Sequence, residues 1–253
     1  MRISRIPALN IPLATEFVKK KRACIFARRK LYYRAIPNTN LEVFMKNHLL
    51  TLRAAVASGI FIGLAGTVFL SVPNKFFGAF LFGFGLLTIV CCTFKLYTGA
   101  VGYLVLQGKK APAYLLTLLE IWIGNWIGTF LVGTALRHSR VGKALAANAE
   151  ALCKVKMADT WTSLLVLSFF CGILMFLAVD TFRRKDEYPG VIRMGMVFLC
   201  VMVFILSGFE HCIADMYYFS VAGMWTPESF ARTLWMTLGN SLGGFLLPLL
   251  GRK

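Results

Sequence analysis

The sequence is poor in charged residues, and in acidic residues above all. Of its 253 residues 15% are charged, and 11 Asp and Glu stand against 28 Lys and Arg. A soluble domain of this size would carry about 25% charged residues. The 3 histidines and 7 cysteines form no Cys-x-x-Cys pair or metal-ligand cluster, so we expect no metal, no cofactor and no enzyme activity, and cysteines that act as small buried hydrophobes.

Hydrophobic residues, in contrast, make up 58% of the chain, and the mean hydropathy is +0.68. A helix needs roughly 17–25 apolar residues to cross a bilayer. Six apolar stretches come near or exceed that length, at residues 54–72, 76–94, 113–136, 161–179, 194–209 and 230–250. The pattern predicts an all-α membrane protein with six transmembrane helices.

Basic residues lie mainly outside these stretches, and residues 1–40 hold ten Lys or Arg against one acid, Glu16. In a soluble protein a net charge of +17 would suggest nucleic acid. In this chain the positive charge is better explained as a signal that sets the orientation in the membrane and as a contact for anionic lipid. We therefore expect no nucleic-acid partner. Both termini are predicted to be cytoplasmic in a multi-pass inner or plasma membrane protein, although the basic loop at 137–159 departs from that bias.

The predicted domains are a basic cytoplasmic tail with an interfacial helix, residues 1–52, and a transmembrane domain, residues 53–253. Within the tail, residues 41–52 mix apolar and polar positions as interfacial helices do. Residues 1–46 contain no continuous apolar run of the kind that marks a secretory signal peptide. An organellar transit peptide is the alternative interpretation of this basic, acid-poor segment.

The transmembrane domain repeats itself at a nearly constant offset. The segment GNWIG at 124–128 is matched by GNSLG at 239–243, and polar interruptions at 93–102 and 207–215 divide the second and fifth apolar stretches. With three spans in each half, about 53–136 and 160–251, the second copy enters the membrane from the opposite side. Such inverted repeats hold their permeation site between the repeats, where broken helices expose backbone groups.

The interruptions carry the most specific motifs. Residues 207–216 read SGFEHCIADM and residues 95–99 read KLYTG. With the two GNxxG segments, they resemble the signatures of the formate/nitrite transporter family, which run close to SGxEHS[IV]ANM and acidic-LFTG. The resemblance covers roughly residues 54–251. It implies an aquaporin-like subunit with helices 2 and 5 broken, and a homopentamer in which each subunit has its own pore.

The resemblance also implies the function and the residues of the site. The substrate would be a small monovalent anion, formate first and nitrite or hydrosulfide next, with protons as a further partner. His211 would be the central pore histidine, Thr98 the opposing threonine, and Glu210 the residue that orients the loop. The other implied positions are Asn125 and Asn240 on helices 3 and 6, one apolar constriction of Phe82, Leu86 and Phe204, and another to which Leu96 and Tyr97 contribute.

A histidine suits this place because it titrates near neutral pH and so donates either a hydrogen bond or a proton. An anion crosses apolar constrictions as a charge at large desolvation cost. The sequence leaves open which of the two His211 donates.

Four positions depart from the family pattern. Lys95 replaces an acid, and we expect it to pair with Glu120 or Glu210 or else to reach the cytoplasmic interface. Cys212 and Asp215 replace Ser and Asn, and Phe176 replaces a polar residue in the fourth helix. The family's loop lysine corresponds to Lys156 at an altered spacing. These departures keep open a second function, a non-transporting membrane sensor or scaffold of the same fold.

Overall fold

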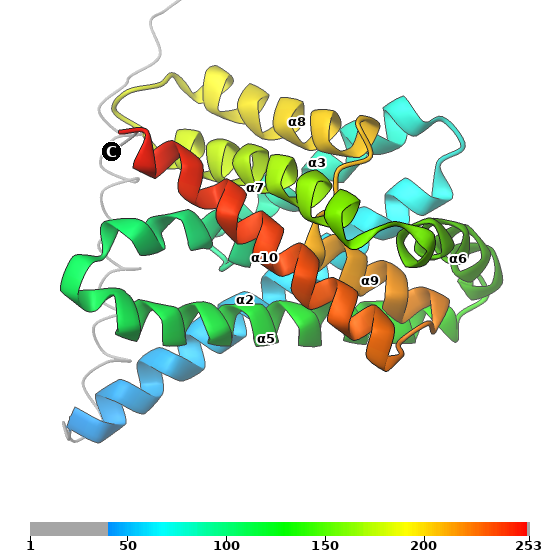
Figure 1. The fold of residues 1–253 in the computed structure, drawn as a ribbon, viewed down its shortest axis with the longest axis horizontal. Helices are drawn as coiled ribbons and strands as arrows, with labels where there is room; N and C mark the ends of the chain where they lie inside the picture. The colour runs from blue at the N-terminus through cyan, green and yellow to red at the C-terminus, as the bar shows by residue number, and fades with distance from the viewer. Residues whose placement is uncertain (1–39, 252–253) are drawn as a thin grey trace, which may run out of the picture. The chain divides into compact units, whose positions relative to one another are not determined.

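A computed structural model of the chain describes residues 40–251, with side chains from residue 45. The predicted tail before residue 40, including the basic clusters at 19–22 and 28–30 and Cys24, lies outside the described residues. Between residues 40 and 251 the chain is helical and holds no strand, which confirms the all-α prediction (Figure 1). The helices are α2 Asn40–Ser71, α3 Lys75–Cys91, α4 Tyr97–Ala100, η1 Val101–Leu106, η2 Gly108–Lys110, α5 Ala111–Arg137, α6 Gly142–Ala158, α7 Trp161–Arg183, α8 Gly190–Leu206, α9 Cys212–Ala222 and α10 Pro227–Leu249.

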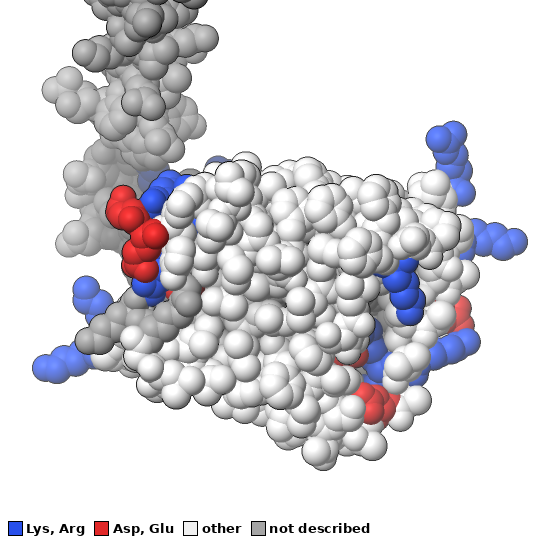
Figure 2. All heavy atoms as spheres, turned by 90° about the horizontal axis from the view of Figure 1, so that it is seen from above, with Lys and Arg blue, Asp and Glu red and all other residues white. Residues whose placement is uncertain are grey.

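The surface of this helical domain is apolar over much of its area. Large hydrophobic side chains are exposed on several helices, for example Leu119, Phe130 and Leu199 at 53%, 45% and 58%. Figure 2 shows charged side chains mainly toward the two sides of the view, with a wide uncharged surface between them. Soluble monomers rarely expose so much contiguous apolar surface. The surface is that of a membrane protein.

In the part of the chain that the structure describes, three helices are long and apolar enough to cross a membrane by length and composition: Met45–Ser71, Gly108–Arg137 and Trp161–Arg183. Shorter apolar helices occupy Lys75–Cys91, Tyr97–Leu106 and Gly190–Leu206. The first of the long helices extends beyond its apolar part. Helix α2 runs from Asn40 to Ser71 without a break, so the segment 41–52 continues into the first apolar stretch, and its position at the membrane surface stays a prediction.

Two helices end where the sequence predicts interruptions. Helix α3 ends at Cys91, and the chain continues in extended form at Leu96 before the short α4 begins. In the same way α8 ends at Leu206 and α9 begins at Cys212 after an extended His211. Helix α3 packs beside α8, and α7 packs beside α10 (Figure 1). The two interruptions thus come from matched positions of the two halves.

Glycines allow the closest helix contacts, and they too occur in matched places. A Cβ atom on Gly59 of α2 would lie 2.2 Å from the carbonyl oxygen of Asn125, and one on Gly172 of α7 would lie 2.2 Å from the carbonyl oxygen of Asn240. No real Cβ comes so near, so only glycine permits these contacts. In each half, therefore, one helix packs closely against the backbone of the Asn in the GNxxG segment, α2 against Asn125 and α7 against Asn240.

The cysteines follow the prediction in part. Cys153, Cys171, Cys200 and Cys212 are buried. Cys91 and Cys92 are free but exposed, because they stand at the end of α3 where the chain leaves the helix. Burial as small hydrophobes therefore holds for four of the six described cysteines.

Candidate functional site

Asn125 holds the break between α3 and α4. Its side-chain Oδ1 accepts the backbone N–H of Tyr97 at 2.9 Å, and its Nδ2 donates to the carbonyl oxygens of Ala55 and Lys95 at 2.8 Å each. A helix that stops at membrane depth leaves backbone groups without partners, and an unpaired group there costs several kcal/mol. One buried amide side chain supplies two of the missing hydrogen bonds, and its third bond ties the loop to Ala55 of α2.

Asn240 does the same at the break between α8 and α9. Its Oδ1 accepts the N–H of Cys212 at 2.9 Å, and its Nδ2 donates to the carbonyl oxygens of Ser168 and Glu210 at 2.7 and 2.9 Å. The partners of Asn125 and Asn240 correspond one to one between the two halves. The two GNxxG segments therefore have one physical purpose, which is to fix the two loops that face each other.

Thr98 and His211 meet where these loops converge. Thr98 Oγ1 lies 2.9 Å from His211 Nε2, and the two residues are 0% and 2% exposed. His211 is also the N-cap of α9, and its Nδ1 accepts the N–H of Ala214 at 3.0 Å. An Nδ1 that accepts carries no proton, so the neutral ring holds its hydrogen on Nε2. His211 is thus set as an Nε2–H donor that points at Thr98.

Apolar side chains close one side of this pair. The Phe204 ring lies 5.6 Å from the His211 ring and 5.8 Å from the Phe82 ring, measured between centroids. Phe82 and Leu86 are each 1% exposed and Phe204 is 4% exposed. The three residues predicted to form a constriction therefore lie in the core around His211.

Two cavities flank the Thr98–His211 contact. One, which we call the His211 cavity, has about 280 Å³ and is lined by residues that include Lys156, Phe204, Glu210, His211 and Asp215. The other, which we call the Lys95 cavity, has about 590 Å³. Its lining includes Leu96 and Gly99, which flank Thr98, and the four basic residues Lys95, Arg183, Lys185 and Arg193. Among the described residues none lines both cavities: His211 lines the first, and the residues that flank Thr98 line the second.

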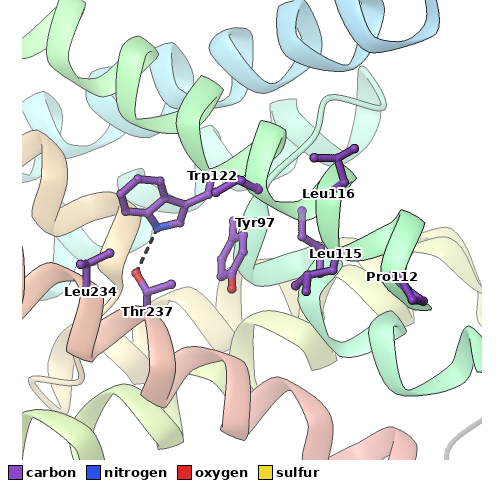
Figure 3. A pocket seen from close by; sticks show the side chains of 9 residues that line it. Tyr97, Pro112, Leu115, Leu116, Trp122, Leu234 and Thr237 are labelled. Atoms are coloured by element: carbon purple, nitrogen blue, oxygen red, sulfur yellow. Dashed lines mark hydrogen bonds between the residues drawn. The ribbon is translucent and has the colours of Figure 1, made fainter. Parts of the chain in front are cut away.

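Tyr97 lines a cavity other than the Lys95 cavity. Its ring lines a third, apolar cavity of about 560 Å³ between α5 and α10, together with Trp122, Leu234 and Thr237 (Figure 3). Its hydroxyl contacts Ser241 Oγ at 3.0 Å. Leu96, the extended N-cap of α4, lines the Lys95 cavity. The contribution of Leu96 and Tyr97 to a second constriction stays a prediction.

Both ion pairs predicted for Lys95 are wrong. Glu120 pairs with His48, and Glu210 pairs with Lys156. Lys95 is exposed and faces its cavity, which agrees with the alternative that its ammonium reaches an aqueous interface. The long side chain makes that possible, since its stem packs along the wall while its charge stays in water.

Lys156 of α6 lies outside the 207–216 motif in the sequence but pairs with two of its carboxylates. Its Nζ pairs with Glu210 Oε2 and, at 2.9 Å, with Asp215 Oδ1. Burial works to lower the pKa of Lys156, but the carboxylates of Asp215 and Glu210 outweigh burial and hold this pKa above its usual range. Lys156 thus remains an ammonium beside His211. Phe176, a further departure, is buried and packs against the Tyr103 ring with centroids 5.1 Å apart.

Sequence reasoning missed the residue that holds Lys156 in place. Arg232 of α10 is 7% exposed, and its Nη1 donates to the carbonyl oxygens of Lys156 and Asp159 at 3.1 and 2.8 Å. It also pairs with Glu228, one turn earlier. A cation at the carbonyl end of a helix is favourable, and Arg232 fixes the end of α6 in this way. A lone Arg inside the sixth apolar stretch was the available signal, since charges in such stretches need partners.

The fold and site define an all-helical membrane protein built from two matched halves, with a buried polar pair between two cavities. Comparison with known proteins then gives the family. The profile of the formate/nitrite transporters matches residues 33–251. The chain belongs to the formate/nitrite transporter family.

Individual relatives agree. The nitrite transporter NirC of Salmonella typhimurium is 30% identical over 186 residues, which cover 67% of each chain. The formate channel FocA of Escherichia coli is 26% identical over 248 residues, which cover 80% of this chain and 85% of FocA. Among solved structures, a pentameric formate channel with formate bound superposes with a TM-score of 0.66 at 25% identity and covers 81% of this chain and 96% of its own.

Proposed function

We propose that this protein is a membrane channel or transporter that passes a small monovalent anion between the Lys95 cavity and the His211 cavity. The observation that carries the proposal is the buried contact of Thr98 Oγ1 with His211 Nε2 at 2.9 Å. His211 lines the His211 cavity, and Leu96 and Gly99, on either side of Thr98 in the chain, line the Lys95 cavity. The anion replaces Thr98 as the acceptor of the Nε2–H group as it passes. A hydrogen bond to a charged acceptor is stronger than one to a hydroxyl.

The position of the hydrogen on the His211 ring determines whether this residue donates a hydrogen bond or a proton to the anion. Because Nδ1 accepts from Ala214, the ring is a neutral donor in the resting state. Of the two possibilities that the sequence leaves open, this geometry favours a hydrogen bond over a proton. The Thr98 hydroxyl accompanies it as a second polar group in an otherwise apolar surrounding.

Positive charge in the Lys95 cavity attracts the anion. Lys95, Arg183, Lys185 and Arg193 line the Lys95 cavity, and no carboxylate of the described residues does. Like charges on the walls of a concave site raise the local concentration of counter-ions. With the N-terminus inside and six crossings, this cavity opens toward the cytoplasm and the His211 cavity opens to the opposite side of an inner or plasma membrane.

Formate is the substrate that we propose first, with nitrite or hydrosulfide next. The support comes from the relatives, which are named as nitrite transporters and formate channels, and from the small space around the buried pair. The structural relative is pentameric, and we propose a homopentamer in lipid with one path in each subunit and helices 2 and 5 broken in each path.

The test is uptake of labelled formate, nitrite and hydrosulfide into proteoliposomes that contain the full chain. We expect uptake of at least one of them well above that of empty liposomes. Uptake that matches empty liposomes for all three would favour the sensor or scaffold function instead.

A further inference from the structure

Asp215 occupies the position of the family's Asn. With Asp215 ionised, the carboxylates around Lys156 outnumber the ammonium groups by one. Lys156 pairs with Glu210 and Asp215 together, and the side chains of these three residues are only 11%, 7% and 2% exposed. Two ionised carboxylates against one ammonium leave a net charge of −1 on side chains that are almost wholly buried. An unpaired buried charge is strongly unfavourable, and such groups neutralise instead.

No other described group supplies the missing positive charge. The titratable groups around Asp215 are Cys153 and Lys156 from α6, Cys171 from α7, Glu210 and His211 from the loop before α9, and Cys212 and Tyr218 from α9 itself. Lys75 of α3 lines the same cavity but forms no ion pair with either carboxylate. His211 is held as a neutral ring.

One carboxyl oxygen of Asp215 indicates how the excess negative charge is neutralised. Asp215 Oδ2 is buried and has no hydrogen-bond partner, whereas Oδ1 binds Lys156. Glu210 and Asp215 bind the same ammonium, so Lys156 Nζ brings their two carboxyl groups together. Two ionised carboxylates cannot bond to each other, because both only accept. A single proton between them would give the orphan oxygen a partner and would make the cluster neutral.

We propose that the Lys156–Glu210–Asp215 cluster holds one proton, shared between its two carboxyl groups, and that Asp215 passes this proton to the anion in the His211 cavity. The proposal rests on the proposed function. In the step, the O–H bond at Asp215 breaks and a bond from that hydrogen to the anion forms. The anion becomes its neutral acid and Asp215 becomes a carboxylate beside Lys156. A hydronium ion from the solution at the cavity mouth then returns a proton to Asp215 and leaves water.

This step removes the main barrier of the path. The next segment is the apolar group of Phe82, Leu86 and Phe204, and a neutral acid enters apolar surroundings at much lower cost than its anion. The proton comes from Asp215 because His211 carries no extra proton to give. His211 keeps its own Nε2–H and holds the substrate by a hydrogen bond.

The test uses Asp215→Asn, which restores the family residue. The amide keeps the size and can still donate a hydrogen bond to Glu210, but it has no transferable proton. In infrared spectra of the purified protein we expect the band of a protonated carboxylic acid, and we expect Asp215→Asn to remove it. Glu150→Gln, at an exposed acid that pairs with Lys154, should leave the band unchanged.

Formate flux into proteoliposomes gives the second measurement. At about pH 7, where formate is almost wholly ionised, we expect Asp215→Asn to be roughly tenfold slower than the unsubstituted protein, and near pH 5 the difference should shrink because the solution itself supplies formic acid. An acid band that persists in Asp215→Asn, or a flux ratio that is the same at both pH values, overturns the proposal. If neither protein transports any anion, the proposed function fails, while the infrared band still decides whether the proton is there.

Discussion

His211 shows how much a single hydrogen bond determines at the residue scale. Its Nδ1 caps α9 by accepting from Ala214, and this one contact places the hydrogen on Nε2 toward Thr98. The same imidazole ring therefore caps α9 with Nδ1 and donates with Nε2, so helix α9 fixes the position of the Nε2–H group. A side chain used in this way is stiff, and its hydrogen bond to a passing anion needs no reorganisation.

Thr98 is the partner that can be changed with least disturbance. Replacing Thr98 by Val keeps the shape of the side chain and removes the hydroxyl, and we expect anion flux to fall about tenfold, because a hydrogen bond is worth roughly 1 kcal/mol or more. Proteoliposome flux measures the effect.

Thr129→Val is the matched control. Thr129 is equally buried, but its hydroxyl bonds only to backbone carbonyls of its own helix. Flux that falls equally in both variants would show that the loss of Thr98 acts through folding and not through the path.

At this scale the sequence predicted some residues well and others poorly. Thr98, His211, Asn125 and Asn240 lie in matched repeats, and the structure brings each to a matched place. The predicted partners of Lys95 failed because linear spacing cannot tell which of several cations an acid will meet. Glu210 is taken by Lys156, which stands on α6 outside the repeats.

At the scale of elements, the broken helices depend on the two asparagines. Asn240 makes three buried hydrogen bonds to backbone groups of α7, the loop and α9. Replacing Asn240 by Ala should lower the free energy of unfolding by about 3 kcal/mol or more, because the backbone partners stay buried without hydrogen bonds. The shift in thermal denaturation of the detergent-solubilised protein checks this.

Asn148→Ala provides the comparison for that experiment, since Asn148 makes a single half-buried bond to the carbonyl oxygen of Leu70. We expect a shift several times smaller. Equal shifts for Asn148→Ala and Asn240→Ala would contradict the account of the helix breaks.

The close contact of α7 with α10 gives a second prediction at this scale. Gly172→Ala places a methyl group 2.2 Å from the carbonyl oxygen of Asn240, so the helices must separate. Overpacking of this kind costs typically 1–3 kcal/mol, and here it also disturbs the bonds of Asn240. We expect a large loss of folded protein in size-exclusion profiles.

Gly195→Ala in α8 is the control, because a Cβ there would meet nothing within 4 Å. It should leave the profile unchanged or raise stability slightly, since Ala favours a helix. A normal profile for Gly172→Ala would refute the contact.

Helix positions followed from the sequence because apolar length and polar interruptions are local signals. The continuity of α2 did not, since the mixed polarity of 41–52 fits both an interfacial helix and the end of a longer one. The short helix α6 between α5 and α7 was not predicted either, because no long apolar stretch marks it. Its importance comes from tertiary contacts, namely Lys156 with Glu210 and Asp215, and Arg232 with its last carbonyl groups.

For the whole molecule, the exposed apolar surface leads to a prediction about assembly. Side chains such as Leu119, Phe130 and Leu199 face outward and must meet lipid or neighbouring subunits. With a pentameric structure as a relative, we expect native mass spectrometry from detergent to give a mass of five chains. A monomer as the sole species at all detergent conditions would contradict this expectation.

The central claim is that anions pass beside His211, and the most direct test changes that ring alone. Replacing His211 by Phe keeps a planar ring in the same place and removes the Nε2–H donor. The control is His138→Phe at an exposed histidine whose Nδ1 contacts only the carbonyl oxygen of Thr134. We predict that His211→Phe abolishes formate flux into proteoliposomes across the pH range, while His138→Phe leaves it unchanged. Equal flux for the unsubstituted protein and His211→Phe would contradict the account.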